Sequence, residues 1–401
     1  MSFITNARRV LQENIREYGM YIALFVIMAI FTVTTKGIFI SPRNISNLIN
    51  QTGYIAVLAV GMTLVIVIRH IDLSVGFLSG FLGAIAAIAM ADPRVISSGL
   101  NLPSYLVIPL VLVLGILAGM LTAFLVAQLG IPAFVATLAG WLGYRGALQL
   151  VTAGSGTIII SDKTFNALSN DFIPDIPGIG FLPEIHKLTL VLGLLAIVLL
   201  IASQINDRRK KQAYNFEVLS LDMFILKLVF VSAITGGITW IMAGYQGLSW
   251  TIVIVLVVVG AYDFITSQTV LGRHIYAIGG NPEAAQLSGI SVKRITYVVF
   301  GSMGMLSALS GILYASRFKS ATTTAGNLFE LEAIAAAFIG GVSPAGGIGK
   351  VIGSLIGALV MGSLSSGMNL MGIDISLQYI VKAAVLAAAV IFDVATRRSG
   401  K

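Results

Sequence analysis

The side chains best suited to chemistry lie close together in one short stretch, Val65–Gly80, which reads VIVIRHIDLSVGFLSG. Arg69, His70 and Asp72 fall there within four positions, between long apolar runs, in a chain with only 10% charged residues. A carboxylate beside a cation and an imidazole could form a catalytic site or an ion relay. Ionisable groups within membrane segments often have such functional roles.

The same stretch also carries the features of a helix break. Asp is a preferred N-cap, because its carboxylate accepts a backbone N–H and complements the positive helix end. Asp72 stands just before an apolar run that continues through Gly76, and Ser74 is a second capping candidate. We therefore interpret Asp72, Ser74 and Gly76 as a break between two helices. A break that lines a cavity exposes polar backbone, so these residues are also candidates for a substrate pathway.

A glycine-rich stretch, Pro344–Gly353 (PAGGIGKVIG), resembles a phosphate-binding loop at first reading. A Walker A motif needs Gly six residues before its Lys and Ser or Thr after it, and Pro344 and Val351 occupy those positions. We expect no enzymatic activity, and any ATP to be hydrolysed by another polypeptide. The chain has no Cys and three His residues scattered at positions 70, 186 and 274, so we expect neither a metal nor a cofactor.

Composition places these residues in a membrane protein. The 401-residue chain is 57% hydrophobic and has a mean hydropathy of +0.95. Several apolar runs reach the roughly 18–20 residues that cross a bilayer as a helix. We predict an all-α integral membrane protein, a polytopic bundle of about 10–12 transmembrane helices. The expected helices are 19–35, 52–68, 74–91, 104–128, 132–152, 187–206, 225–243, 249–267, 295–315, 330–342, 349–369 and 376–394.

Two features of these helices bear on their packing. The segments 52–68 and 74–91 could together be one broken helix. Glycines recur at four-residue spacing, at positions 76 and 80, 115 and 119, and 349, 353 and 357. Such rows allow helix backbones to approach closely in lipid, so we interpret them as packing surfaces and not as functional sites.

The charges of the loops predict the orientation. With a cytoplasmic N-terminus, the basic residues at 208–211, 273, 293–294 and 397–401 share the cytoplasmic side, as the positive-inside rule requires. We predict a single transmembrane domain, 1–401, with both termini cytoplasmic. Its expected parts are a cytoplasmic N-terminal segment 1–18, a periplasmic loop 153–186, a cytoplasmic basic loop 207–224 and a cytoplasmic loop 271–294.

The last of these loops contains a predicted short helix, Asn281–Gly289 (NPEAAQLSG). Asn281 is a good N-cap, Pro282 suits the first helical position, and Glu283 favours the positive helix end. Gly289 suits the left-handed residue that closes a helix. A helix of about two turns is too short to span a bilayer. It is either a rigid projection on the cytoplasmic side or an ordinary interfacial turn.

Three blocks of sequence resemble the permease subunits of ribose, xylose and galactose ATP-binding cassette (ABC) importers. They are Gly61-Met62-Thr63 with Ile71–Gly76, then Leu271–Asn281 with Glu283-Ala284-Ala285 and Ser288–Ile290, then Phe338–Gly341 with Gly346–Gly349. The chain departs from the family at Arg69-His70, where many members have Gly. An insertion around residues 160–260 is similar to the xylose or multiple-monosaccharide branch.

The resemblance implies a fold similar to that of the vitamin B12-type importer permeases, in the bacterial inner membrane. It also implies three partners: a cytoplasmic ABC ATPase, a periplasmic sugar-binding protein and a second permease copy. The coupling helix that receives the ATPase's motion would contain Asn281, Pro282, Glu283, Ala284, Ala285 and Gly289. Two alternatives stay open: an ABC permease for a nucleoside, an autoinducer or a branched-chain amino acid, and an ion-coupled secondary transporter.

Overall fold

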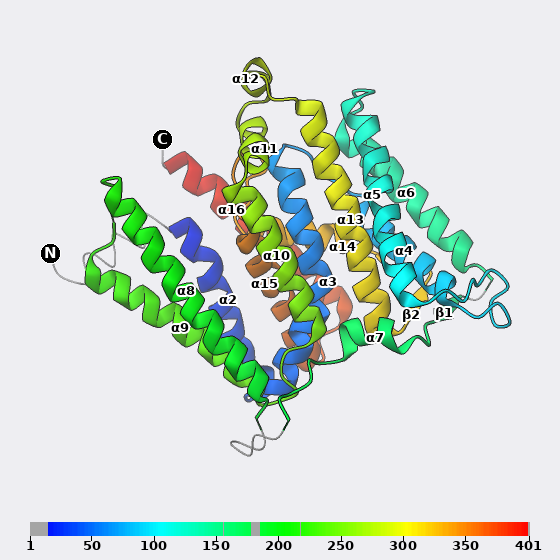
Figure 1. Ribbon diagram of the computed structural model, residues 1–401, viewed down its shortest axis with the longest axis horizontal. Helices are drawn as coiled ribbons and strands as arrows, with labels where there is room; N and C mark the ends of the chain where they lie inside the picture. The colour runs from blue at the N-terminus through cyan, green and yellow to red at the C-terminus, as the bar shows by residue number, and fades with distance from the viewer. Residues whose placement is uncertain (1–14, 155, 178–184, 217, 400–401) are drawn as a thin grey trace. The chain divides into compact units, whose positions relative to one another are not determined.

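The computed structural model describes residues 15–399 except for residues 155, 178–184 and 217, so most of the predicted N-terminal segment 1–18 lies outside the described residues. The described chain is mostly helical (Figure 1). Seven of its helices are long and apolar enough to cross a membrane, and the shorter apolar helices Gly19–Thr34, Val75–Met90 and Ile375–Ile391 accompany them. The predicted all-α polytopic membrane protein is confirmed.

The chain divides into two compact units. Among the described residues, the first unit comprises Ile15, Ile40–Asn47 and Phe172–Ser249, and the second comprises the rest. Helix α3 (Pro42–Val67) begins in the first unit and continues into the second.

The first unit is built on a helical hairpin. Helices α8 (Lys187–Ala213) and α9 (Leu221–Ala243) pack closely, because a Cβ at Gly193 of α8 would overlap the side chain of Thr239 of α9. An antiparallel bridge between Phe172 and Ser249 joins the two ends of the unit's longer segment. The two ends of this segment are therefore adjacent, and the whole segment lies within the insertion expected at 160–260.

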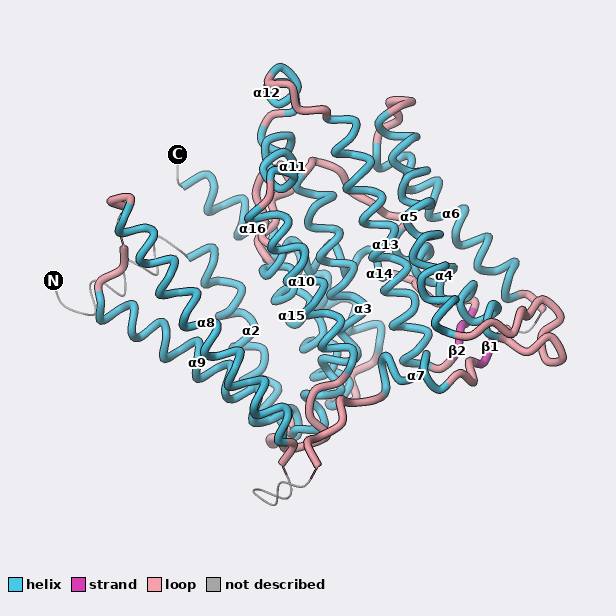
Figure 2. Tube along the Cα trace, in the orientation of Figure 1, coloured by secondary structure: helices cyan, strands magenta, loops and turns pink. Residues whose placement is uncertain are grey.

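The second unit holds the other elements, apart from the end residues Ile15 and Ile40. They are α2 (Ile15–Thr34), the 3-10 helix η1 (Ile38–Ile40), α4 (Val75–Met90), α5 (Ser104–Ala127), α6 (Ala133–Thr152), α7 (Lys163–Asn170), α10 (Trp250–Gln268), α11 (Val270–Gly280), α12 (Pro282–Leu287), α13 (Val292–Phe318), α14 (Phe329–Ile339), α15 (Val351–Leu370) and α16 (Ile375–Ser399). Strands β1 (Thr157–Ile159) and β2 (Ser320–Thr322) pair antiparallel. Figure 2 shows α12 and this ribbon at opposite ends of the unit.

The centre of the second unit is α13, which packs against α4 and α5 through glycines. A Cβ at Gly304 of α13 would overlap the carbonyl oxygen of Gly115 of α5, and a Cβ at Gly119 would overlap that of Phe300. Gly311 lies equally close to the carbonyl oxygen of Ser79 in α4. Lipid supplies no hydrophobic drive between helices, so such close approach has to supply the packing energy. The packing role predicted for Gly115 and Gly119 is confirmed.

The largest differences from the expected element boundaries are four. Helix α8 continues to Ala213 and α9 begins at Leu221, so most of the predicted loop 207–224 is helical. Helix α3 begins at Pro42 and not at residue 52. Hydropathy missed its first turns because they contain the polar Ser46 and Asn50, although both side chains are buried. Helix α7 and strand β1 lie inside the predicted loop 153–186, and β1 pairs there with the distant strand β2. Helix α11 occupies much of the predicted loop 271–294, where Thr269 caps it by accepting the N–H of Gly272 at 3.2 Å.

Candidate functional site

The short helix predicted from the sequence is α12, Pro282–Leu287, and its start is capped as expected. The Oδ1 of Asn281 accepts the N–H of Ala284 at 3.0 Å. Pro282 occupies the start of the helix, where its missing N–H has no cost, and Glu283 lies in the first turn, next to the positive helix end.

The end of α12 is closed by two backbone hydrogen bonds. The N–H of Gly289 donates to the carbonyl of Gln286, and the N–H of Ile290 donates to that of Ala285, both at 3.0 Å. This pair of bonds defines the Schellman motif, in which the residue after the helix is left-handed. Gly289 has a φ of +85°, a conformation that strains any residue with a Cβ. Since both ends are fixed, α12 is a short rigid projection.

Most of α12 is available to a partner. Glu283 and Ala284 are exposed, whereas Ala285 is buried against the rest of the unit. Leu287, at the end of the helix, is 90% exposed. The geometry of α12 therefore suits contact with another protein.

Arg69, in the stretch Val65–Gly80, anchors the segment that leads into α12. Its Nε donates to the carbonyl of Gly279 at 2.7 Å, and its Nη2 donates to the carbonyl of Gly280. These carbonyls end α11, where the helix dipole is negative and a cation is stabilising. Arg69 itself has a φ of 65°, so its backbone adopts a left-handed turn directly after α3. It thereby connects the end of α3 to the end of α11.

The glycine-rich stretch Pro344–Gly353 contributes to the same junction by packing. The N–H of Gly347 donates to the carbonyl of Val67 at 2.9 Å. A Cβ at Gly279 would overlap that same carbonyl oxygen. Tyr276 of α11 adds a hydrogen bond to the carbonyl of Gly349 at 2.5 Å. The ends of α3 and α11 and the loop before α15 therefore meet beside α12, and we name this meeting point the α12 junction.

The predicted helix break lies immediately after this junction. Helix α3 ends at Val67 and α4 begins at Val75. The Oδ1 of Asp72 accepts both the backbone N–H of Ser74, at 2.9 Å, and its hydroxyl, at 2.6 Å. These bonds end at Ser74, the N-cap residue of α4, and not at an N–H inside the helix. Asp72 therefore orders the turn before α4 instead of capping its first turn directly.

Gly76 packs against a buried carboxylate that the sequence did not single out. Glu330 in the first turn of α14 is 4% exposed, and its Oε1 accepts the indole N–H of Trp141 at 2.9 Å. Its Oε2 has no hydrogen-bond partner among the described residues. A Cβ at Gly76 would overlap this Oε2. The N-terminal ends of α4 and α14 thus meet around one acidic side chain, which positive helix ends stabilise.

The structure therefore brings the predicted residues together in two groups. Asn281–Gly289 form α12, and Asp72, Ser74 and Gly76 form the turn into α4. Arg69 lies between the two groups, because it follows α3 and bonds to α11. Within the described residues, no group of three His, Cys, Asp or Glu could hold a metal ion.

Comparison with known proteins identifies the class to which this chain belongs. A family model described as "Branched-chain amino acid transport system / permease component" matches residues 44–390. The chain belongs to this family of transport-system permeases, and its resemblance to the permease subunits of ABC importers is confirmed. No solved structure matches the chain significantly.

The names of individual relatives specify the solute more narrowly than the family description does. The chain is 37% identical over 385 residues to the xylose transport system permease protein XylH of Escherichia coli K12, an alignment that covers 96% of this chain and 93% of the relative. XylH of Haemophilus influenzae is also 37% identical, with 96% and 98% covered. The ribose import permease protein RbsC of Haemophilus influenzae is 36% identical over 377 residues, with 94% and 93% covered.

Proposed function

We propose that this chain is the membrane-spanning subunit of an ABC importer that moves a monosaccharide, such as the pentose xylose, across the bacterial inner membrane. The observation that carries the proposal is the doubly capped α12, attached to the α12 junction, in a chain whose relatives are xylose and ribose permeases. A rigid projection transmits a push from a partner into the bundle, whereas a flexible loop would absorb it.

The proposal implies three partners for this chain. A cytoplasmic ABC ATPase would contact α12 and hydrolyse ATP, because the stretch Pro344–Gly353 packs as a structural loop and lacks a Walker A pattern. A periplasmic binding protein would deliver the sugar, and a second permease copy would complete the pathway. Arg273 and Lys293-Arg294 flank α12, which supports a cytoplasmic position for it and for both termini.

Two alternatives differ in the solute or in the energy source. The family description names branched-chain amino acids, so an amino acid permease with the same coupling is one alternative. An ion-coupled carrier is the other, and it would need a titratable group that changes charge during transport. Lys382 and Glu332 form an ion pair at 2.6 Å, which opposes a change of charge at either of these two groups.

Uptake measurements in cells separate these possibilities. Cells that lack other xylose uptake systems would express the chain with its ATPase and binding protein, and would be given labelled D-xylose. The proposal predicts uptake that stops when ATP is depleted and continues when an uncoupler is added at clamped ATP. Uptake that follows the proton or sodium gradient would overturn the ABC assignment. Uptake of labelled leucine without xylose would overturn the sugar assignment.

A further inference from the structure

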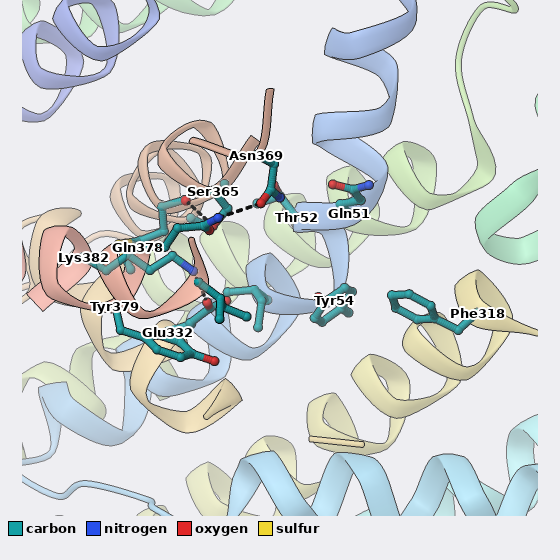
Figure 3. A pocket seen from close by; sticks show the side chains of 15 residues that line it. Gln51, Thr52, Tyr54, Phe318, Glu332, Ser365, Asn369, Gln378, Tyr379 and Lys382 are labelled. Carbon is teal, nitrogen blue, oxygen red and sulfur yellow. Dashed lines mark hydrogen bonds and ion pairs between the residues drawn. The ribbon is translucent and has the colours of Figure 1, made fainter. Parts of the chain in front are cut away.

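A polar pocket opens between α3, α14, α15 and α16, wholly within the second unit (Figure 3). Its volume is about 370 Å³, near the small end of the roughly 300–1,000 Å³ typical of ligand pockets. Phe318, the last residue of α13, lines it, whereas α12 precedes the first residue of α13. The 27 residues of α13 span about 40 Å, so the pocket and α12 lie at opposite membrane faces. With α12 cytoplasmic, the pocket faces the outside.

One wall of the pocket is a network of polar side chains. The Nε2 of Gln378 donates to the Oδ1 of Asn369 at 2.8 Å and to the carbonyl of Ile373 at 3.0 Å. The Nζ of Lys382 donates to the Oε1 of Glu332 at 2.6 Å. These bonds leave further donors on Asn369 and Lys382 and acceptors on Gln378 and Glu332. Polar groups at membrane depth are costly unless they are paired or line a wet, functional cavity.

The opposite wall is aromatic. Figure 3 shows Tyr54 and Phe318 facing the network of Gln378, Lys382 and Glu332 across the pocket. The Tyr54 ring is held by neighbouring rings, with centroids 4.9 Å from Phe329 and 5.2 Å from Tyr314. The face of an aromatic ring carries negative charge and attracts weakly positive C–H groups.

This combination selects one kind of occupant. Because the charges of Lys382 and Glu332 neutralise each other, the pocket does not favour a charged ligand. Mixed donors and acceptors match hydroxyl groups, each of which both donates and accepts. The face of an aromatic ring such as that of Tyr54 matches the C–H face of a pyranose ring. We propose that this pocket binds the transported monosaccharide directly on the outer side of the permease, after the binding protein has released it. The inference rests on the proposed function and adds a sugar site within this chain.

The pocket is also connected to the coupling helix through one element. Thr52 and Tyr54 line the pocket from α3, and the same helix ends at Val67, next to Arg69 and the α12 junction. About 20 Å of continuous helix separates Tyr54 from Val67. A displacement of α12 by the ATPase would therefore reach the pocket through α3.

Cysteine protection tests the pocket directly, since the chain contains no native Cys. Ser365→Cys places a thiol of nearly native size in the pocket, and Val95→Cys, at an 81% exposed site outside it, is the control. Right-side-out vesicles with the full transporter would be labelled with a membrane-impermeant thiol reagent, with and without D-xylose. We expect xylose to slow labelling at position 365 and not at position 95, and L-leucine to protect neither. Gln51 also lines the pocket, from α3. Adding Gln51→Leu to the Ser365→Cys chain should raise the half-protecting xylose concentration roughly two- to tenfold, the loss of about one hydrogen bond.

Each contrary result has a distinct meaning. Equal rates with and without xylose at position 365, or equal protection at position 95, would overturn the sugar pocket. Protection by leucine without xylose would assign the pocket to an amino acid and overturn the sugar as its ligand. Xylose uptake by the same vesicles is measured in parallel. Uptake without protection rejects the pocket and leaves the proposed function intact, whereas absence of uptake rejects the proposed function itself.

Discussion

Removing the guanidinium of Arg69 is the sharpest perturbation of the α12 junction. Arg69→Ala deletes the hydrogen bonds to the carbonyls of Gly279 and Gly280 but keeps a Cβ at the same left-handed φ, so backbone strain does not change. A hydrogen bond to a charged group contributes about 1.5–3 kcal/mol. Arg69 is exposed, so water compensates in part. We expect the free energy needed to separate the end of α11 from α3 to fall by about 1–2 kcal/mol. The fraction of molecules in which this contact is open should then rise about 5- to 30-fold.

Hydrogen exchange of the full transporter measures this opening. Peptides that cover residues 276–290 should exchange about 5- to 30-fold faster in Arg69→Ala, since exchange reports local opening free energies. Arg69→Lys should be intermediate, because an ammonium is a point donor and lacks the fork of the guanidinium. Arg94→Ala is the control, with a side chain 92% exposed and 3.9 Å from Asp92.

Function should change together with exchange. Arg69→Ala is expected to retain ATP hydrolysis and to transport fewer sugar molecules for each ATP. Unchanged exchange in residues 276–290, together with wild-type transport per ATP, would refute the argument that Arg69 joins α3 to the segment that leads into α12.

Three further predictions concern the helix break and the topology. Gly76→Ala should lower the free energy of unfolding by about 1–3 kcal/mol, measured by thermal unfolding, because its Cβ would overlap Glu330. Gly143→Ala, where the added Cβ meets open space, is the control and should be neutral or slightly stabilising. Asp72→Asn should keep much of the transport, because Asn retains an acceptor for the turn, whereas Asp72→Ala should lose about 1 kcal/mol of stability. An inactive, well-folded Asn variant that is no more stable than the Ala variant would exclude this structural role. A cysteine at Gln212 should react only from the cytoplasm, and labelling from outside would reverse the proposed topology.

Hydropathy and capping residues predicted much of the fold. Helices such as α5 and α6 begin and end near their expected residues, because each is an apolar run bounded by Pro or Gly. The short helix at Asn281–Gly289 was visible for the same reason, since capping is local in sequence. The start of α3 was missed, because burial of Ser46 and Asn50 depends on distant segments and not on their own hydropathy.

Contacts between distant segments could not be predicted. Lys382 has no acidic partner at helical spacing, and its partner Glu332 lies on another helix, 50 positions away. Arg69 reaches across 210 positions to Gly279. The charge of Arg69 was conspicuous in an apolar chain, but its partners are backbone carbonyls, which leave no mark in a sequence. Glu330 was passed over because nothing near it in sequence indicates its contact with Gly76.

The central claim is that α12 receives the motion of an ATPase, and coupled turnover in reconstituted vesicles tests it most directly. The variants are Gly289→Pro, which cannot adopt the φ of +85° that closes α12, and Glu283→Lys, which reverses the charge at its start. Gly130→Pro, which imposes the same backbone strain at another left-handed glycine (φ +73°) after α5 and outside α12, is the matched control. Loaded binding protein should stimulate ATP hydrolysis and sugar uptake in the wild type and in the control. Both α12 variants, at normal expression, should lose this stimulation or hydrolyse ATP without uptake. Wild-type stimulation and uptake in both α12 variants would contradict the account.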